Sequence, residues 1–194
     1  TKKRGLLLNF GTLVGHSTLR RGIVRDEFRK LSEEELSQMK ELLKVGLQDG
    51  ASGFSTGLNY SHVKMAPQEE IADLVSVLKK GQIYSTHLRN EEEGLYESIL
   101  ETIEIAKKTE ASVEISHFKA VGKNNWPIFE KCLEIIEKAA ENYDINFDIY
   151  PYDSTATVFY TLLPDWVAVG GRVKLIENLE NNGLRTKIMN ELQG

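Results

Sequence analysis

Helix-like and strand-like segments alternate along most of this chain, and this alternation limits its fold more than any other feature. Apolar residues recur at helical spacing after the capping box of Ser32 and Glu35, after Pro67, from Leu95 to Ala106, and after Pro127. Between these segments lie shorter strand-like stretches that end at His16, Thr56, His87, His117 and Tyr150. The last four ends are roughly 30 residues apart, the length of a βαβ unit. The pattern predicts an α/β fold with a parallel sheet.

Two architectures compete for such a pattern, an open doubly wound sheet and part of a (β/α)8 barrel. A dinucleotide-binding sheet requires a G-x-G-x-x-G turn, and no glycines of this chain have that spacing. A complete barrel needs about 250 residues and eight strands, whereas this chain has 194 residues and the pattern predicts five strands. Because residue 1 is Thr and not Met, we expect the sequence to be a piece of a longer protein. The pattern of residues 172–194 predicts one more amphipathic helix, which lies outside the repeating strand–helix units.

Composition argues against several classes of partner. The chain has 24 Lys and Arg residues against 29 Asp and Glu, a net charge of −5, so it lacks the basic surface that holds nucleic acid. No apolar stretch approaches the roughly 20 residues of a membrane span, and nothing resembles a signal peptide. The single cysteine, Cys132, falls in a helical pattern and predicts a buried core thiol. One cysteine makes no internal disulfide, and a cytoplasmic location is expected.

His87 and His117 carry the strongest chemical signal, because each closes a predicted strand and they lie one βα unit apart. Carboxyl ends of neighbouring parallel strands meet at one rim about 4.8 Å apart, so two imidazoles there suit a zinc ion. The alternative is that each histidine makes an ordinary hydrogen bond. The residues leave a third ligand open: His16 fits either a ligand or a hydrogen-bonding role.

Cationic and phenolic side chains accompany these histidines. Arg89 and Lys119 each lie two residues beyond a histidine, and Tyr150 ends the next predicted strand. Such groups suit a substrate that carries a carboxylate. The alternatives are that Arg89 pairs with the acidic run Glu91–Glu93 and that Lys119 lies on the surface. The run itself is expected to be a solvated helix start.

Six segments, taken in order, resemble the D-aminoacylase (N-acyl-D-amino-acid deacylase) family of metal-dependent amidohydrolases. The resemblance spans roughly residues 9 to 171. The segments are VGHSTLR (14–20), GASGFSTGL (50–58), THLRNE (86–91), ISHFK (115–119), DIYPY (148–152) and LPDW (163–166).

This resemblance implies a distorted (β/α)8 barrel of which residues 1–171 supply about the third to the seventh strand. Residues 172–194 resemble the variable segment that follows the seventh strand. It also implies that His87 and His117 are zinc ligands, that Lys119 and Tyr150 hold the substrate α-carboxylate, and that Tyr60 polarises the reacting carbonyl. The family's other ligands and its catalytic aspartate lie outside this sequence, so the chain is expected to carry part of an active site.

The implied reaction is zinc-dependent hydrolysis of small N-acyl-D-amino acids to a carboxylate and a free D-amino acid. Two alternatives stay open: another amidohydrolase acting on a cyclic amide or a dipeptide, and a non-catalytic α/β binding domain. The segment ending in Phe54, Ser55 and Thr56 has no lysine, which argues against the branch that includes dihydroorotase. The absence of Arg and Lys between residues 154 and 163 favours neutral or apolar D-side chains over acidic ones.

Overall fold

One parallel sheet organises the computed structural model, which describes residues 8–25 and 27–193. Each strand pairs with its neighbour in the sequence, so the spatial order is the chain order. The strands are β1 (Leu13–Gly15), β2 (Gly53–Gly57), β3 (Ile83–His87), β4 (Ser112–Ile115) and β5 (Ile145–Phe147).

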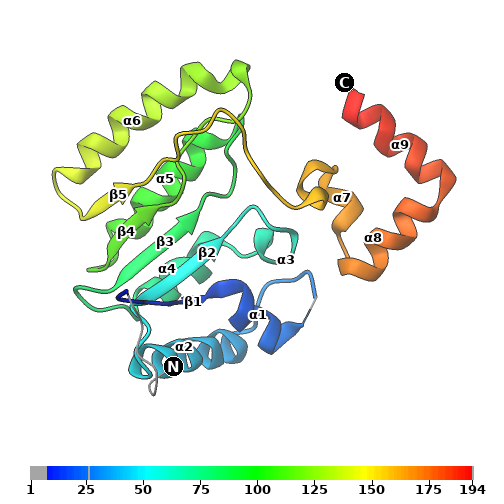
Figure 1. Cartoon of the computed structure of the whole chain (residues 1–194). Coiled ribbons are helices and arrows are strands. Elements are labelled where there is room, and N and C mark those ends of the chain that lie inside the picture. Colours follow the sequence, from blue (N-terminus) through cyan, green and yellow to red (C-terminus); the bar gives the residue numbers. More distant parts are fainter. Residues whose placement is uncertain (1–7, 26, 194) are drawn as a thin grey trace.

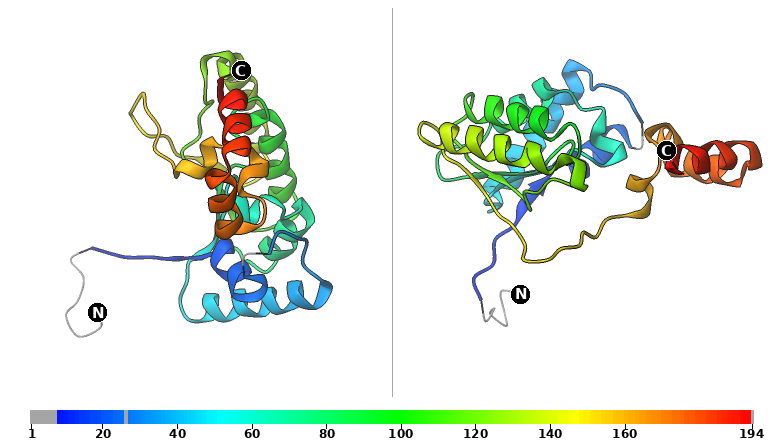
Figure 2. Two further views of the ribbon diagram at one scale, coloured as in Figure 1. Left: turned by 90° about the vertical axis from the view of Figure 1, so that its right-hand side faces the viewer. Right: turned by 90° about the horizontal axis from the view of Figure 1, so that it is seen from above.

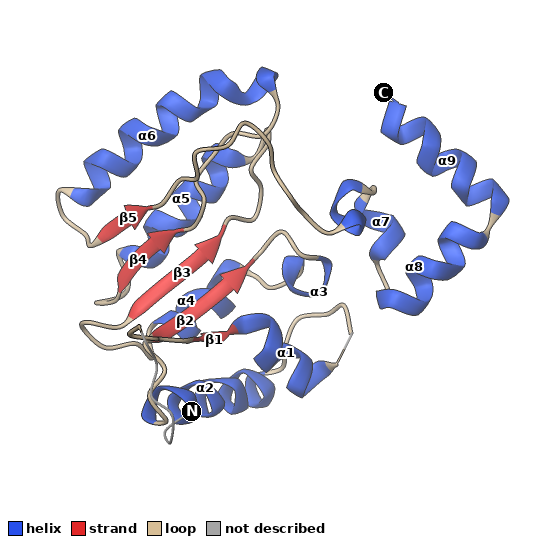
Figure 3. Ribbon diagram, viewed as in Figure 1, coloured by secondary structure: helices blue, strands red, loops and turns tan. Residues whose placement is uncertain are grey.

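Helices link these strands and cover the sheet. They are α1 (His16–Val24), α2 (Glu33–Gln48), α3 (Ser61–Lys64), α4 (Gln68–Val75), α5 (Leu95–Ala106) and α6 (Trp126–Ala140), with a 3-10 turn, η1 (Lys123–Asn125), before α6. Helix α5 packs against α4 and α6, and Figures 1 and 3 show α4 and α5 behind the strands. A doubly wound sheet reverses its strand order and carries helices on both faces. The sequential order instead makes this sheet an arc of a (β/α)8 barrel, as the sequence predicted.

Alternation along the strands divides the sheet into two faces. Phe54, Tyr84, Val113 and Ile145 occupy one row of the register and are buried in the core under the helices. The next row, Ser55, Ser85, Glu114 and Asn146, is polar and faces the opposite side. His87 is level with Gly57 at the carboxyl end of the polar face. The sheet therefore presents His87 at its rim, on the face away from the helices.

Several local predictions are confirmed. Helix α2 begins at the predicted capping box, in which the Glu35 amide donates to Ser32 Oγ and the Ser32 amide donates to Glu35 Oε2. Cys132 is fully buried in the main core, and burial raises the pKa of its thiol to about 11. No helix in the described residues is both long enough and apolar enough to span a bilayer.

Other boundaries differ from the predictions. Strand β4 ends at Ile115 and β5 at Phe147, so His117 and Tyr150 lie in the loops beyond them. His16 begins helix α1, and helix α4 ends at Val75, before Gly81.

The C-terminal region has a small core of its own. Residues 172–194 were predicted to form one helix, but the described residues 172–193 hold two, α8 (Gly171–Glu180) and α9 (Asn182–Gln193); residue 194 lies outside the described residues. A 3-10 turn, η2 (Phe159–Leu162), and α7 (Asp165–Ala168) precede them. Leu163, Val167 and Ile188 form the buried cluster. Figure 2 shows α8 and α9 to one side of the sheet, and an ion pair between Lys64 Nζ and Asp165 Oδ1, 2.6 Å apart, connects α3 to α7.

Candidate metal centre

Two imidazole rings converge at the carboxyl edge of the sheet. His87 is the last residue of β3, and His117 follows the end of β4 by two residues. Nδ1 of His87 lies 2.8 Å from Nε2 of His117, and the ring centroids are 4.5 Å apart. The predicted pairing of these histidines is thus present in the structure.

The backbone of His117 is turned to make this contact. Its φ angle is 44°, in the left-handed region that residues with a side chain seldom adopt. The His117 amide donates to Asp148 Oδ1 at 2.7 Å, and the Phe118 amide donates to the Asp148 carbonyl at 2.8 Å. Asp148 therefore holds the turn that directs the His117 ring toward His87. Backbone strain of this kind is common at functional sites.

The donor set suits a zinc ion. Burial lowers the pKa of His87, which favours the neutral imidazole that binds metals. The facing nitrogens are near enough that a small separation of the two rings would let His87 Nδ1 and His117 Nε2 both bind one zinc ion at the usual distance of about 2.0–2.1 Å. The other ring nitrogen of His87, Nε2, is buried without a hydrogen-bond partner among the described residues.

Glu91 completes the cluster and was misjudged from the sequence. The run Glu91–Glu93 was expected to be solvated, and this is wrong for Glu91, whose side chain is only 8% exposed. Its Oε1 lies 2.6 Å from Lys119 Nζ and 3.1 Å from His117 Nδ1. Burial opposes its negative charge, but hydrogen bonds from His117 and Lys119 outweigh this effect and hold its pKa below the usual range. A signal existed, since Glu91 ends the THLRNE segment four residues after His87.

Lys119 and Tyr150 lie beside the cluster, and their role in binding a substrate carboxylate stays a prediction. Lys119 Nζ also approaches the His117 carbonyl and Nδ1, each at 3.1 Å. The same ammonium lies 5.7 Å from the centre of the Tyr150 ring. A cation and a phenol therefore flank the paired histidines on the side of β4 and β5.

Tyr60 lies on the other side of His87. Its ring is tilted against the imidazole with the centroids 5.2 Å apart. The ring occupies space that only a glycine at position 57 leaves free, because a Cβ there would lie 2.7 Å from Tyr60 Cδ2 and Cε2. The structure thus brings together Tyr60, His87, His117, Lys119 and Tyr150.

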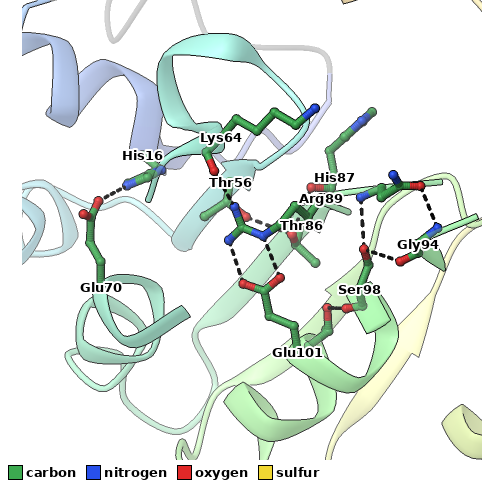
Figure 4. A network of polar contacts seen from close by, with 12 residues as sticks. His16, Thr56, Lys64, Glu70, Thr86, His87, Arg89, Gly94, Ser98 and Glu101 are labelled. Atoms are coloured by element: carbon green, nitrogen blue, oxygen red, sulfur yellow. Dashed lines mark hydrogen bonds and ion pairs between the residues drawn. The ribbon is translucent and has the colours of Figure 1, made fainter. Parts of the chain in front are cut away.

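Arg89 is engaged elsewhere. Its guanidinium makes a two-pronged ion pair with Glu101, at 2.7 and 2.8 Å, and donates to the Lys64 carbonyl at 2.9 Å (Figure 4). The alternative considered from the sequence was pairing with the acidic run Glu91–Glu93, but the carboxylate that Arg89 contacts is that of Glu101. Arg89 joins the loop after β3 to α5 and to the end of α3, and a role in substrate binding stays a prediction.

His16 also has a partner away from the cluster. Its Nε2 lies 2.9 Å from Glu70 Oε1, and Arg20 Nη1 donates to both oxygens of the same carboxylate (Figure 4 shows the His16–Glu70 contact). His16, Arg20 and Glu70 are all buried. Of the two roles considered for His16, these contacts correspond to hydrogen bonding.

An arc of sequentially ordered parallel strands with two imidazoles at its carboxyl edge defines a segment of a metal-dependent amidohydrolase barrel. No protein-family model matches the chain. Among curated proteins, D-aminoacylase of Alcaligenes xylosoxydans xylosoxydans is 36% identical over 166 residues, covering 85% of this chain and 34% of that protein. N-acyl-D-aspartate deacylase of the same organism is 35% identical over 153 residues, covering 78% of this chain and 31% of the relative.

Solved structures of the same family are also similar to this chain. N-acyl-D-glutamate deacylase from Bordetella bronchiseptica, complexed with zinc and a phosphonate inhibitor, aligns with a TM-score of 0.74 at 31% identity over 78% of this chain and 32% of that one. A D-aminoacylase with a binuclear metal centre aligns with a TM-score of 0.71 at 33% identity over 77% and 32%. The chain belongs to the D-aminoacylase family of amidohydrolases, and it spans about one third of the length of the relatives it matches.

Proposed function

We propose that this chain supplies part of a zinc-dependent active site that hydrolyses N-acyl-D-amino acids to a carboxylate and a free D-amino acid. The observation that carries the proposal is the convergence of His87 Nδ1 and His117 Nε2, 2.8 Å apart, with the Lys119 ammonium beside them. The names of the related proteins support the substrate class, because they are deacylases of N-acyl-D-amino acids.

His87 and His117 are the residues that hold zinc in this proposal, together with ligands from the rest of the site. A zinc ion bound there supplies Lewis acidity toward the amide carbonyl and a nucleophilic water at neutral pH. The neutral state of His87, favoured by its burial, keeps a lone pair available for the metal.

The flanking side chains bind and orient the substrate. Lys119 offers a positive charge to the α-carboxylate, and the Tyr150 hydroxyl donates a second hydrogen bond to it. The Tyr60 hydroxyl, on the opposite side of His87, donates to the carbonyl oxygen as negative charge develops on it. In this proposal Lys119 and Tyr150 hold the carboxylate, while the amide carbonyl lies at the zinc within reach of Tyr60.

The D-side chain in this proposal is neutral or apolar. No Arg or Lys occurs between residues 154 and 163, the segment after Tyr150 that contains η2. This segment therefore offers no positively charged side chain to pair with an acidic D-side chain. Two of the relatives are named as deacylases of N-acyl-D-aspartate and N-acyl-D-glutamate. The preference is therefore tested by comparing neutral with acidic D-substrates.

Hydrolysis assays on the full-length protein test the proposal. The panel contains N-acetyl-D- and N-acetyl-L-methionine, N-acetyl-D-glutamate, a dipeptide and a cyclic amide. We expect turnover of the D-methionine derivative, loss of this turnover on chelation and recovery with zinc. Turnover confined to the dipeptide or the cyclic amide would assign a different amidohydrolase reaction. No turnover and no bound metal would support a binding domain instead.

A further inference from the structure

We propose that Glu91 is a positioning residue that orients both a metal ligand and the substrate-binding cation of this site. The inference rests on the proposed function and deepens it. One carboxylate oxygen, Oε1, lies within hydrogen-bond distance of His117 Nδ1 and Lys119 Nζ. Glu91 therefore couples a side chain that holds zinc to one that holds the substrate.

The first role of Glu91 is to set the tautomer of His117. Nε2 of His117 faces His87, so it must present a lone pair when the two rings share a metal ion. The proton of the neutral ring then resides on Nδ1, which donates to Glu91 Oε1 3.1 Å away. Carboxylates commonly fix the orientation of metal-bound histidines and raise their basicity in this way.

The second role concerns Lys119. Once His117 Nδ1 carries a proton, it no longer accepts a hydrogen bond from the ammonium. Lys119 then donates to Glu91 Oε1 at 2.6 Å and to the His117 carbonyl at 3.1 Å, and its third N–H is free for a substrate carboxylate. Tyr150 lies on the same side, since its ring centre is 5.7 Å from Lys119 Nζ.

Ligand atoms of Glu91, His87 and His117 lie within 4.8 Å of one another, but the contacts of Glu91 favour an orienting role over direct metal ligation. Its carboxylate contacts Nδ1 of His117, whereas the nitrogen that faces His87 is Nε2, on the far side of the ring. The backbone is fixed as well, because the Glu91 carbonyl accepts a hydrogen bond from the Val121 amide at 2.7 Å. The loop after β3 is thereby tied to the loop after β4, and the carboxylate is held behind the ligand.

Glu91→Gln in the full-length protein tests this role, with Glu93→Gln as a matched control at an exposed position of the same run. Zinc affinity is measured by competition with a chromogenic chelator, coordination by the visible spectrum of the cobalt-substituted protein, and KM and kcat with an N-acyl-D-amino acid. Thermal melting of each variant verifies that it folds. Glu91→Asp, which keeps the charge, provides a conservative comparison.

We expect Glu91→Gln to bind zinc about 10- to 100-fold more weakly, to raise KM more than it lowers kcat, and to keep the cobalt spectrum of the parent. Glu93→Gln should match the parent, and Glu91→Asp should recover part of the lost affinity. Zinc affinity and KM equal to those of Glu93→Gln would overturn the inference. A changed cobalt spectrum would overturn it in favour of direct ligation. If the parent itself bound no zinc, the proposed function would fail first.

Discussion

His87 Nδ1 and His117 Nε2 lie 2.8 Å apart although the two residues come from separate βα units. Two features of the fold produce this contact. Parallel pairing of β3 and β4 places the carboxyl ends of both strands at one edge. The left-handed turn at His117, held by Asp148, then directs the second ring toward the first. The predictions that follow concern the side chains around this pair.

Tyr60→Phe removes the hydroxyl that we assign to the developing oxyanion. Loss of one such donor lowers kcat by on the order of 100-fold or more, because the interaction strengthens in the transition state. KM and zinc content should change little. Steady-state kinetics measure the effect, with Tyr143→Phe, which packs against the main core, as the control. Equal kcat values for the two variants would contradict the assignment.

Gly57→Ala displaces the Tyr60 ring without altering its chemistry. The new Cβ would lie 2.7 Å from two ring carbons, so the ring must move from its place against His87. Misplacing a catalytic group by about 1 Å lowers the rate by on the order of 100-fold. Gly22→Ala is a suitable control, since a Cβ there meets nothing within 4 Å. The account is wrong on this point if Gly57→Ala retains the kcat of Gly22→Ala.

Arg89→Met tests the two roles considered for Arg89. Its ion pair with Glu101 is partly buried, so removal leaves the carboxylate without its partner and lowers the free energy of unfolding by about 1–3 kcal/mol. Urea denaturation measures this change. Arg29→Met, which breaks an exposed pair with Glu35, should change the free energy of unfolding much less, because exposed ion pairs contribute little to stability. A raised KM with unchanged stability would instead support the predicted substrate contact.

His16 gives the fold a defined pH dependence. Burial lowers the pKa of His16 from its usual value of 6.5, despite the opposing contact with Glu70. As the pH falls below 6.5, the unfolded chain takes up a proton at His16 before the folded chain does. The contribution of His16 to the free energy of unfolding is therefore fully present above this pH and decreases as the pH falls. The slope from one such group is at most about 1.4 kcal/mol per pH unit.

Denaturant unfolding between pH 5 and pH 7.5 detects this contribution as the difference between the parent and His16→Gln. The Glu70 carboxylate does not interfere in this range. Burial works against its charge, yet hydrogen bonds from His16 and Arg20 keep its pKa below the usual 4.5. The variant should show a shallower loss of stability on acidification. Identical slopes would show that His16 takes up its proton equally in both states.

The sequence was sufficient to predict the class of fold, because helical and strand periodicities alternate and the unit length is regular. It predicted Tyr60, His87, His117, Lys119 and Tyr150 as site residues, and the structure brings these together. It did not reveal that Glu91 is buried. A carboxylate in an acidic run looks solvated until Lys119 and His117, which come from the next βα loop, are seen to enclose it.

One helix boundary and one arginine partner also differ from the predictions, for different reasons. The C-terminal helix divides at Asn181, whose backbone is extended, and the run Asn181-Asn182-Gly183 is a local signal for this break that the prediction of one helix overlooked. Arg89 pairs with Glu101, twelve residues away on α5, and not with the carboxylates nearest in sequence. The pairing of Arg89 depends on tertiary packing, which local sequence patterns do not contain.

The most direct test of the central claim is the zinc content of the full-length protein, determined by elemental analysis for the parent and for His117→Ala, with Lys123→Ala as a control further along the same β4–α6 connection. The account predicts that the parent and the control retain zinc and that His117→Ala loses most of it while remaining folded. Unchanged zinc in His117→Ala would contradict the assignment of the paired histidines as the metal site.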